Sequence, residues 1–247
     1  MQYFVDQNSV VRKIWGKSDT VLFIFAGAAA EFALNKAVDW LYYTGKLPSD
    51  PLGRLFSTVR YAHKIVFSPT DEAHKALEGL RHIHGALEQS RGYAIPDWAY
   101  RDVLFMLIHY SIASYELLEN KLSDAEKEEV YNVFFRLGTG MGLKSLPTSY
   151  TEWLPVRKAH LKEDLEKSKY TDDLFLQYKK HLGAFRFNVL IEGQKLVVPD
   201  RVRTLLNFST HSLLAPVVPL YKFSRLLKMD WVLKSVLFPP AYKQQIK

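Results

Sequence analysis

Two side chains that could act together in a reaction lie four residues apart in the first half of the chain. If Arg54 and Thr58 are on a helix, the guanidinium and the hydroxyl project from the same face, one turn apart. His82 and His84 follow downstream, but two residues apart on a helix they point about 200° away from each other. At most one of these histidines can therefore serve the same site as Arg54 and Thr58.

His84 is the better candidate of the pair. Arg81 lies three residues before it and Glu88 four residues after it, so a carboxylate on its own face could orient the ring and fix its tautomer. A third histidine, His109, lies in the middle of a very apolar segment, where a buried imidazole needs a hydrogen-bond partner. Without further context, His84 could instead be an ordinary surface histidine, and His109 could instead be a core histidine whose ring is hydrogen-bonded to a carbonyl or hydroxyl group.

The elements that must position these residues are helices, because apolar residues recur at helical spacing and strand-like alternation is nearly absent. A first helix is predicted over residues 20–43. A second begins near Leu52, with Asp50 as its cap and Pro51 at its first position, and it carries Arg54 and Thr58. A third, with Ser68 as its cap, carries both histidines near its end.

The remaining segments are also predicted to be helical. Residues 97–121 form the most apolar helix of the middle region and are expected to be the spine of the core. Ser123 with Glu126 forms a capping box that begins the next helix. The glycine-rich run at 138–142 is interpreted as the end of that helix rather than as a phosphate cradle. A helix over 148–167 is expected to be broken or delayed by Pro155, and a short strand pair is predicted around residues 192–193.

Composition excludes several classes of chemistry. The chain has no cysteine, so a disulfide, a thiolate nucleophile, an iron–sulfur cluster and a cysteine-ligated haem are all excluded, and any metal must be held by histidine, carboxylate or tyrosine. The net charge is +7, but the basic residues are interleaved with acids, which favours a solvated surface over nucleic-acid binding. The motifs of P-loop enzymes, dinucleotide-binding proteins, zinc peptidases and α/β-hydrolases are absent.

The length and hydropathy suggest one all-α domain over residues 1–247, since no Pro/Gly/Ser-rich linker divides the chain. The most apolar run, residues 21–30, is well short of the ~20 residues that span a bilayer. The N-terminus carries no secretory signal pattern. We therefore expect a soluble, cytoplasmic protein without a transmembrane segment, in which the apolar C-terminal third could make peripheral membrane contact.

The order of several motifs resembles a known family. DPLGR-x-x-x-T is followed by RHIHG, then by LIHYSIASYELLENKLSDAE, VFFRLGTGMGL and LPTSYTEWLPV. This order is similar to that in the catalytic-domain family shared by rubber oxygenase (latex clearing protein) and the MpaB-like oxygenase of the mycophenolic-acid pathway. The resemblance covers residues 21–182, and the later PDRVR and LFPPAY segments are similar in character.

The resemblance implies an all-α, globin-like multi-helix domain with a buried pocket for haem b, acting with O₂ on a hydrophobic substrate. It implies His84 as the iron ligand, Arg54 and Thr58 as catalytic residues, Arg54 also at a haem propionate, and His109 as a pocket residue. The rubber enzyme has a lysine where this chain has Ser57, so cleavage of polyisoprene does not transfer directly.

The catalytic base has no exact counterpart, and the nearest acids are Glu31 and Asp39. Two other functions remain open from the sequence. One is an enzyme of the same fold with another cofactor, and the other is a non-catalytic carrier of a hydrophobic small molecule in an aromatic-rich cavity. The sequence does not indicate the oligomeric state.

Overall fold

The structure is a computed structural model that describes residues 2–43 and 50–226. Every regular element in these ranges is a helix, and the only β-type pairings there are the isolated bridges Tyr3–Pro69 and Asn35–Leu165. The all-α prediction is therefore confirmed. The helices are α1 Val10–Trp15, α2 Ser18–Phe32, α3 Asp39–Tyr43, α5 Pro51–Phe67, α6 Thr70–Arg91, α7 Asp97–Leu118, α8 Asp124–Gly140, α9 Tyr150–Glu163, α10 Lys169–Val197, α11 Asp200–Leu205 and α12 Val217–Leu226.

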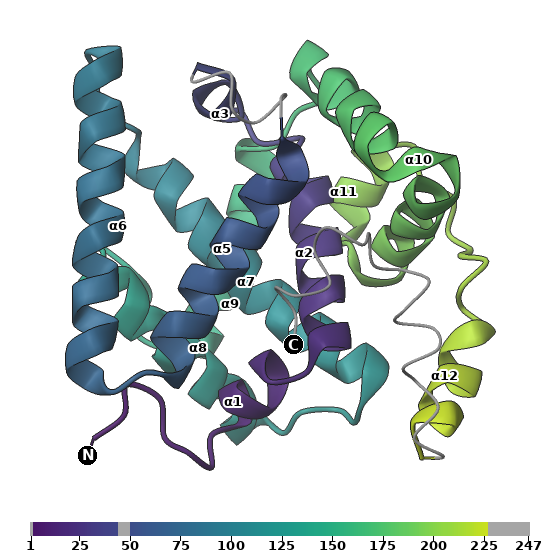
Figure 1. The fold of residues 1–247 in the computed structure, drawn as a ribbon, viewed down its shortest axis with the longest axis horizontal. Coiled ribbons are helices and arrows are strands. Elements are labelled where there is room, and N and C mark those ends of the chain that lie inside the picture. Colours follow the sequence, from purple (N-terminus) through teal and green to yellow (C-terminus); the bar gives the residue numbers. More distant parts are fainter. Residues whose placement is uncertain (1, 44–49, 227–247) are drawn as a thin grey trace.

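Helix α7 is the central element, as its apolar sequence predicts. It runs diagonally behind α5 and packs against α1, α2, α8, α9, α10 and α12 (Figure 1). Phe105 is fully buried on α7 and meets Trp153 of α9 edge to face at 6.0 Å. Trp15 of α1 donates a hydrogen bond to the buried Ser111 hydroxyl at 3.2 Å, so its polar nitrogen is satisfied inside the core.

Helices α2 and α7 approach each other closely because α2 contains small residues. Gly27 faces the Tyr110 ring, and a Cβ at this position would lie 2.3 Å from two ring carbons. A glycine therefore allows the two backbones to come together at the level of the polar side chains described below.

Helices α5 and α6 form an antiparallel pair joined at Ser68 and Pro69. The side chain of Asp50 caps α5 by accepting from the Gly53 amide at 2.8 Å, and Pro51 occupies the first turn, both as predicted. Ser68 ends α5, and Pro69 rather than Ser68 is the cap of α6, one residue later than predicted. The two helices meet at the bottom of Figure 1 and diverge towards the top.

The single helix predicted over residues 20–43 is wrong. The chain forms α2, turns, and resumes as α3 at Asp39. Asn35 explains the break, because its side-chain oxygen accepts from the Ala37 amide at 2.8 Å and its amide donates to Asp102. An asparagine side chain that bonds to nearby backbone competes with the helix, and here a buried partner fixes that alternative.

Two further local predictions are wrong, and two are confirmed. Residues 192–193 lie inside α10 rather than in strands, where Glu192 and Lys195 pair at 2.5 Å one turn apart. Pro155 lies within α9 without breaking it. The Ser123–Glu126 capping box is present, and residues 138–142 do end α8, where Gly142 has a φ of +86°.

Candidate functional site

The two histidines of α6 have different environments. The His82 side chain is 81 % exposed and lies 3.9 Å from Glu78 on its own helix. His84 is half-buried, and its ring lies against the Tyr100 ring of α7 with 5.1 Å between the centroids. The sequence preference for His84 therefore coincides with the histidine that faces a neighbouring helix.

Glu88 orients Tyr100 beside His84. The Tyr100 hydroxyl donates to a Glu88 oxygen at 3.1 Å, and the Ile95 amide donates to the same oxygen at 2.8 Å. Burial and the Glu88 carboxylate raise the pKa of Tyr100 well above its usual value, so the hydroxyl stays protonated as a donor. That Glu88 acts on the His84 ring itself stays a prediction, and these contacts show that Glu88 holds the aromatic ring that packs on His84.

Arg54 and His84 lie at the same level of the α5–α6 pair. Arg54 precedes Ser68 by 14 residues and His84 follows Pro69 by 15, so at 1.5 Å per residue both are roughly 21–23 Å from the turn. Thr58 is exposed and lies one turn closer to the turn than Arg54. The side chain of Arg54 lies outside the part of the chain that the structure describes.

Few side chains of neighbouring helices cover the part of α6 that carries His84. The fully buried residues of α6, Ala73, Ala76 and Leu77, all lie in its first eight positions. On either side of His84, a Cβ added at Gly79 or Gly85 would meet no atom within 4 Å. Glycine inside a helix costs about 1 kcal/mol relative to alanine, and neither glycine is required by a neighbouring side chain in the structure.

His109 lies in a different part of the fold. It is nine residues beyond Tyr100 on α7, which corresponds to roughly 14 Å along the helix axis. Burial and then the Arg157 charge lower the pKa of His109 to about 4, while Glu31 and a backbone hydrogen bond at Val197 act in the opposite direction. The imidazole is therefore neutral near pH 7. The charges that act on it are those of Arg157 on α9 and Glu31 on α2, so it belongs to a different part of the fold from His84.

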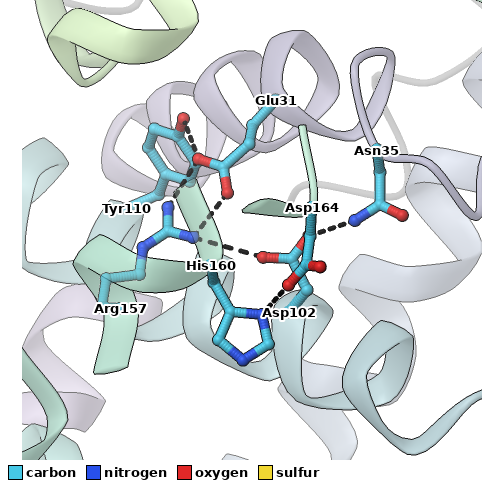
Figure 2. Close-up of polar contacts among 7 residues, drawn as sticks. All are labelled: Glu31, Asn35, Asp102, Tyr110, Arg157, His160 and Asp164. Carbon is cyan, nitrogen blue, oxygen red and sulfur yellow. Dashed lines mark hydrogen bonds and ion pairs between the residues drawn. The ribbon is translucent and has the colours of Figure 1, made fainter. Parts of the chain in front are cut away.

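A buried ion pair joins α2 to α9 (Figure 2). Arg157 binds Glu31 through both terminal nitrogens, each 2.6 Å from a carboxylate oxygen, and the side chains are 4 % and 0 % exposed. The Tyr110 hydroxyl of α7 donates to Glu31 at 2.9 Å. Such a bidentate, buried ion pair is among the strongest contacts that a guanidinium makes.

A second carboxyl group competes for the same arginine. Asp102 of α7 lies 3.4 Å from Arg157 and accepts from the Asn35 amide (Figure 2). Burial and then the nearby Glu31 charge raise the pKa of Asp102 to about 8. One arginine balances one carboxylate, so near pH 7 the arrangement is a Glu31–Arg157 ion pair beside a protonated Asp102.

His160 and Asp164 extend this polar cluster at the end of α9. Their side chains lie 2.5 Å apart, one turn from each other (Figure 2). Burial lowers the pKa of His160 despite the opposing Asp164 charge. The cluster of charged and polar groups therefore ties α2, α7 and α9 together.

Both acids suggested as a catalytic base are engaged in ion pairs. Glu31 is held by Arg157, as above. Asp39 of α3 lies 2.5 Å from Arg91, whose guanidinium also covers the rings of Trp40 and Tyr43 at 4.1 and 5.3 Å. Asp39 therefore anchors α3 to the end of α6, and the structure gives both carboxylates a structural role.

Several of these residues were not found from the sequence. Asp102 is an acid directly before the long apolar run of α7, a pattern that could have marked it as a buried polar group. Arg157 lies in the basic run RKAHLKED and carries no signal that separates it from its solvated neighbours. Tyr100 is one of 14 tyrosines, and only its contact with His84 sets it apart.

No helix in the described ranges is long and apolar enough to cross a membrane. Within the same ranges, no group of three or more histidine, aspartate or glutamate side chains could hold a metal ion. A haem iron differs from such a site, because the macrocycle supplies four ligands and the protein needs to supply only one.

Comparison with known proteins gives one match. The model of a family described as "ER-bound oxygenase mpaB/B'/Rubber oxygenase, catalytic domain" matches residues 13–234. The match extends beyond the 21–182 resemblance at both ends and covers most of the chain. Neither the curated proteins nor the solved structures contain a significant match.

Proposed function

The chain belongs to the catalytic-domain family of the ER-bound oxygenases mpaB/B' and rubber oxygenase, and from this premise we propose that it is a haem-b-dependent oxygenase with His84 as the iron ligand. The substrate class that we propose is a hydrophobic small molecule, oxidised or cleaved with O₂. The proposal also retains a cytoplasmic location and one domain over residues 1–247.

The observation that carries the ligand assignment is the environment of His84. A half-buried imidazole held against an aromatic ring could bind a haem iron, and the fully buried residues of α6 all lie nearer its start than His84 does. The residues present therefore fit a haem.

The roles of the chain's own residues follow from their placement. His84 would bind the iron, and Tyr100, fixed by Glu88, would restrict rotation of the imidazole. Arg54, at the same level of the helix pair, is proposed at a propionate or near bound oxygen, and Thr58 is proposed as a hydrogen-bond donor there. When bound, haem supplies the capacity to bind and activate O₂.

His109 stays a predicted pocket residue. Its distance along α7 from Tyr100 argues against direct ligation at the same iron. A neutral imidazole at this depth is suited to accepting or donating one hydrogen bond to a bound molecule rather than to carrying charge.

The proposal is tested by haem titration of the full chain, followed by its Soret absorbance. Wild-type protein is expected to bind one haem per chain, and His84→Ala is expected to bind at least about tenfold more weakly, because the iron loses its protein ligand. His82→Ala is the matched control, since this exposed histidine lies on the same helix, and it should bind as wild type does. A His84→Ala spectrum and stoichiometry identical to wild type would refute the ligand assignment, and co-purified lipid without haem binding would favour the carrier function.

A further inference from the structure

Gln194 of α10 is a buried polar side chain without a hydrogen-bond partner. The residue is 0 % exposed, yet neither its side-chain oxygen nor its side-chain nitrogen forms a hydrogen bond within the described part of the chain. Burying an unpaired amide costs free energy, so native proteins pair the great majority of such groups. A carboxamide that has no partner inside the protein therefore indicates a partner that is not part of the chain.

The surroundings of this carboxamide are apolar. Leu190, one turn before Gln194, packs on the buried cluster that contains Tyr178, and Val197, three residues after Gln194, belongs to the main hydrophobic core. Residues four before and three after a helical position lie on the same face as that position. The inner face of α10 therefore surrounds one polar group with hydrocarbon.

A second polar side chain, His109 of α7, approaches the same turn of α10. Its ring is hydrogen-bonded to the backbone of Val197. A neutral imidazole that donates from one ring nitrogen keeps the other nitrogen as an acceptor. His109 is half-buried, so protein atoms leave part of its surface uncovered. Gln194 and His109 therefore offer neutral donors and acceptors from two helices that pack against each other.

The charges around these two residues are already paired. Glu192 and Lys195, on the same turn of α10, lie 2.5 Å apart. Glu31 and Arg157, the charges that act on His109, bind each other at 2.6 Å. An ionic ligand would therefore be buried without a counter-charge, which is far more costly than burying a neutral polar group that forms hydrogen bonds.

We propose that Gln194 binds the polar end of a neutral, hydrophobic ligand that carries a hydroxyl or carbonyl group. The carboxamide can donate to or accept from either group, and the apolar face of α10 would contact the hydrocarbon part. Helix α10 packs against α5, and α5 lies between α6 and α10 in Figure 1. The identification of this ligand with the substrate rests on the proposed function, in which α5 carries Arg54 and Thr58.

The first test is the thermal stability of Gln194→Met in the full chain without added ligand. Methionine has a similar length and no amide, so the melting temperature should rise by roughly 2–4 °C as a buried unpaired group is removed. Gln177→Met is the matched control, because Gln177 lies on the same helix and donates to Asp173 at 3.3 Å. Its melting temperature should not rise. A lower melting temperature for Gln194→Met would show that the carboxamide is satisfied in the folded chain, by protein or by an internal water, and would overturn the proposal.

The second test is calorimetric titration of the full chain with benzyl alcohol and with toluene. Wild type and Gln177→Met should bind benzyl alcohol. Gln194→Met should bind it about tenfold more weakly and bind toluene no less tightly than wild type does, because only the alcohol uses the carboxamide. Absence of wild-type binding to benzyl alcohol, or an equal loss for both probes, would overturn the proposal. Neither measurement depends on haem, so a chain that binds benzyl alcohol through Gln194 but binds no haem would contradict the proposed function alone.

Discussion

Replacing Arg157 with methionine should strongly destabilise the protein. The guanidinium makes two contacts of 2.6 Å to Glu31, and both side chains are almost completely excluded from solvent. Removing one partner leaves a carboxylate buried without its counter-charge, which typically costs about 3–5 kcal/mol. For a chain of this size that corresponds to a decrease in melting temperature of roughly 6–20 °C.

The assay is a double-mutant cycle followed by thermal and urea unfolding. Glu31→Gln alone should cost less than Arg157→Met, because Asp102 can ionise and take the place of Glu31 beside Arg157. The double variant should be more stable than Arg157→Met by about 1 kcal/mol or more, since no unpaired buried charge remains. A loss below about 1 kcal/mol for Arg157→Met, or a double variant no more stable than it, would refute this interpretation of the cluster.

Two other changes test the account of the helix core. The pKa of Asp102 is about 8 in the folded chain against an ordinary 3.8, so between these pH values the folded chain holds a proton that the unfolded chain has lost. The free energy of unfolding should therefore decrease as the pH rises towards 8. The lowered pKa of His109 opposes this decrease only below pH 6.5, so the decrease should be clearest between pH 6.5 and 8. Asp102→Asn should reduce that fall in urea unfolding, and an unchanged slope would contradict the assignment. Gly27→Ala should lower stability by about 1–3 kcal/mol because its methyl group would meet the Tyr110 ring, whereas the control Gly79→Ala, with open space around it, should be neutral or stabilising. Equal melting temperatures for the two alanine variants would rule out the close contact.

The parts of the fold predicted correctly are those governed by local patterns. The α5 start, the Ser123 capping box and the apolar central helix depend on residues close in sequence, so periodicity and caps were sufficient. The break after α2 depends on Asn35 meeting Asp102, 67 residues away, and a local pattern cannot reveal such a partner. The helix across residues 192–193 likewise overrides a strand-like sequence through packing against other helices.

The same distinction applies to the candidate site. Helical spacing separated His84 from His82, and the structure places only His84 against another helix. Glu88 also accepts a hydrogen bond from Tyr100, a contact that the sequence could not indicate because Tyr100 comes from a different helix. The Glu31–Arg157 pair joins residues 126 positions apart, and the charge pattern around Arg157 resembles any solvated surface.

The most direct test of the central claim is chemical rescue of the proposed iron ligand. His84→Gly removes the imidazole and leaves space for a free one, so haem binding followed by the Soret band should be lost and then restored by added imidazole. His82→Gly should bind haem as wild type does, with no response to imidazole. If His84→Gly binds haem with the wild-type spectrum and affinity before imidazole is added, His84 is not the iron ligand.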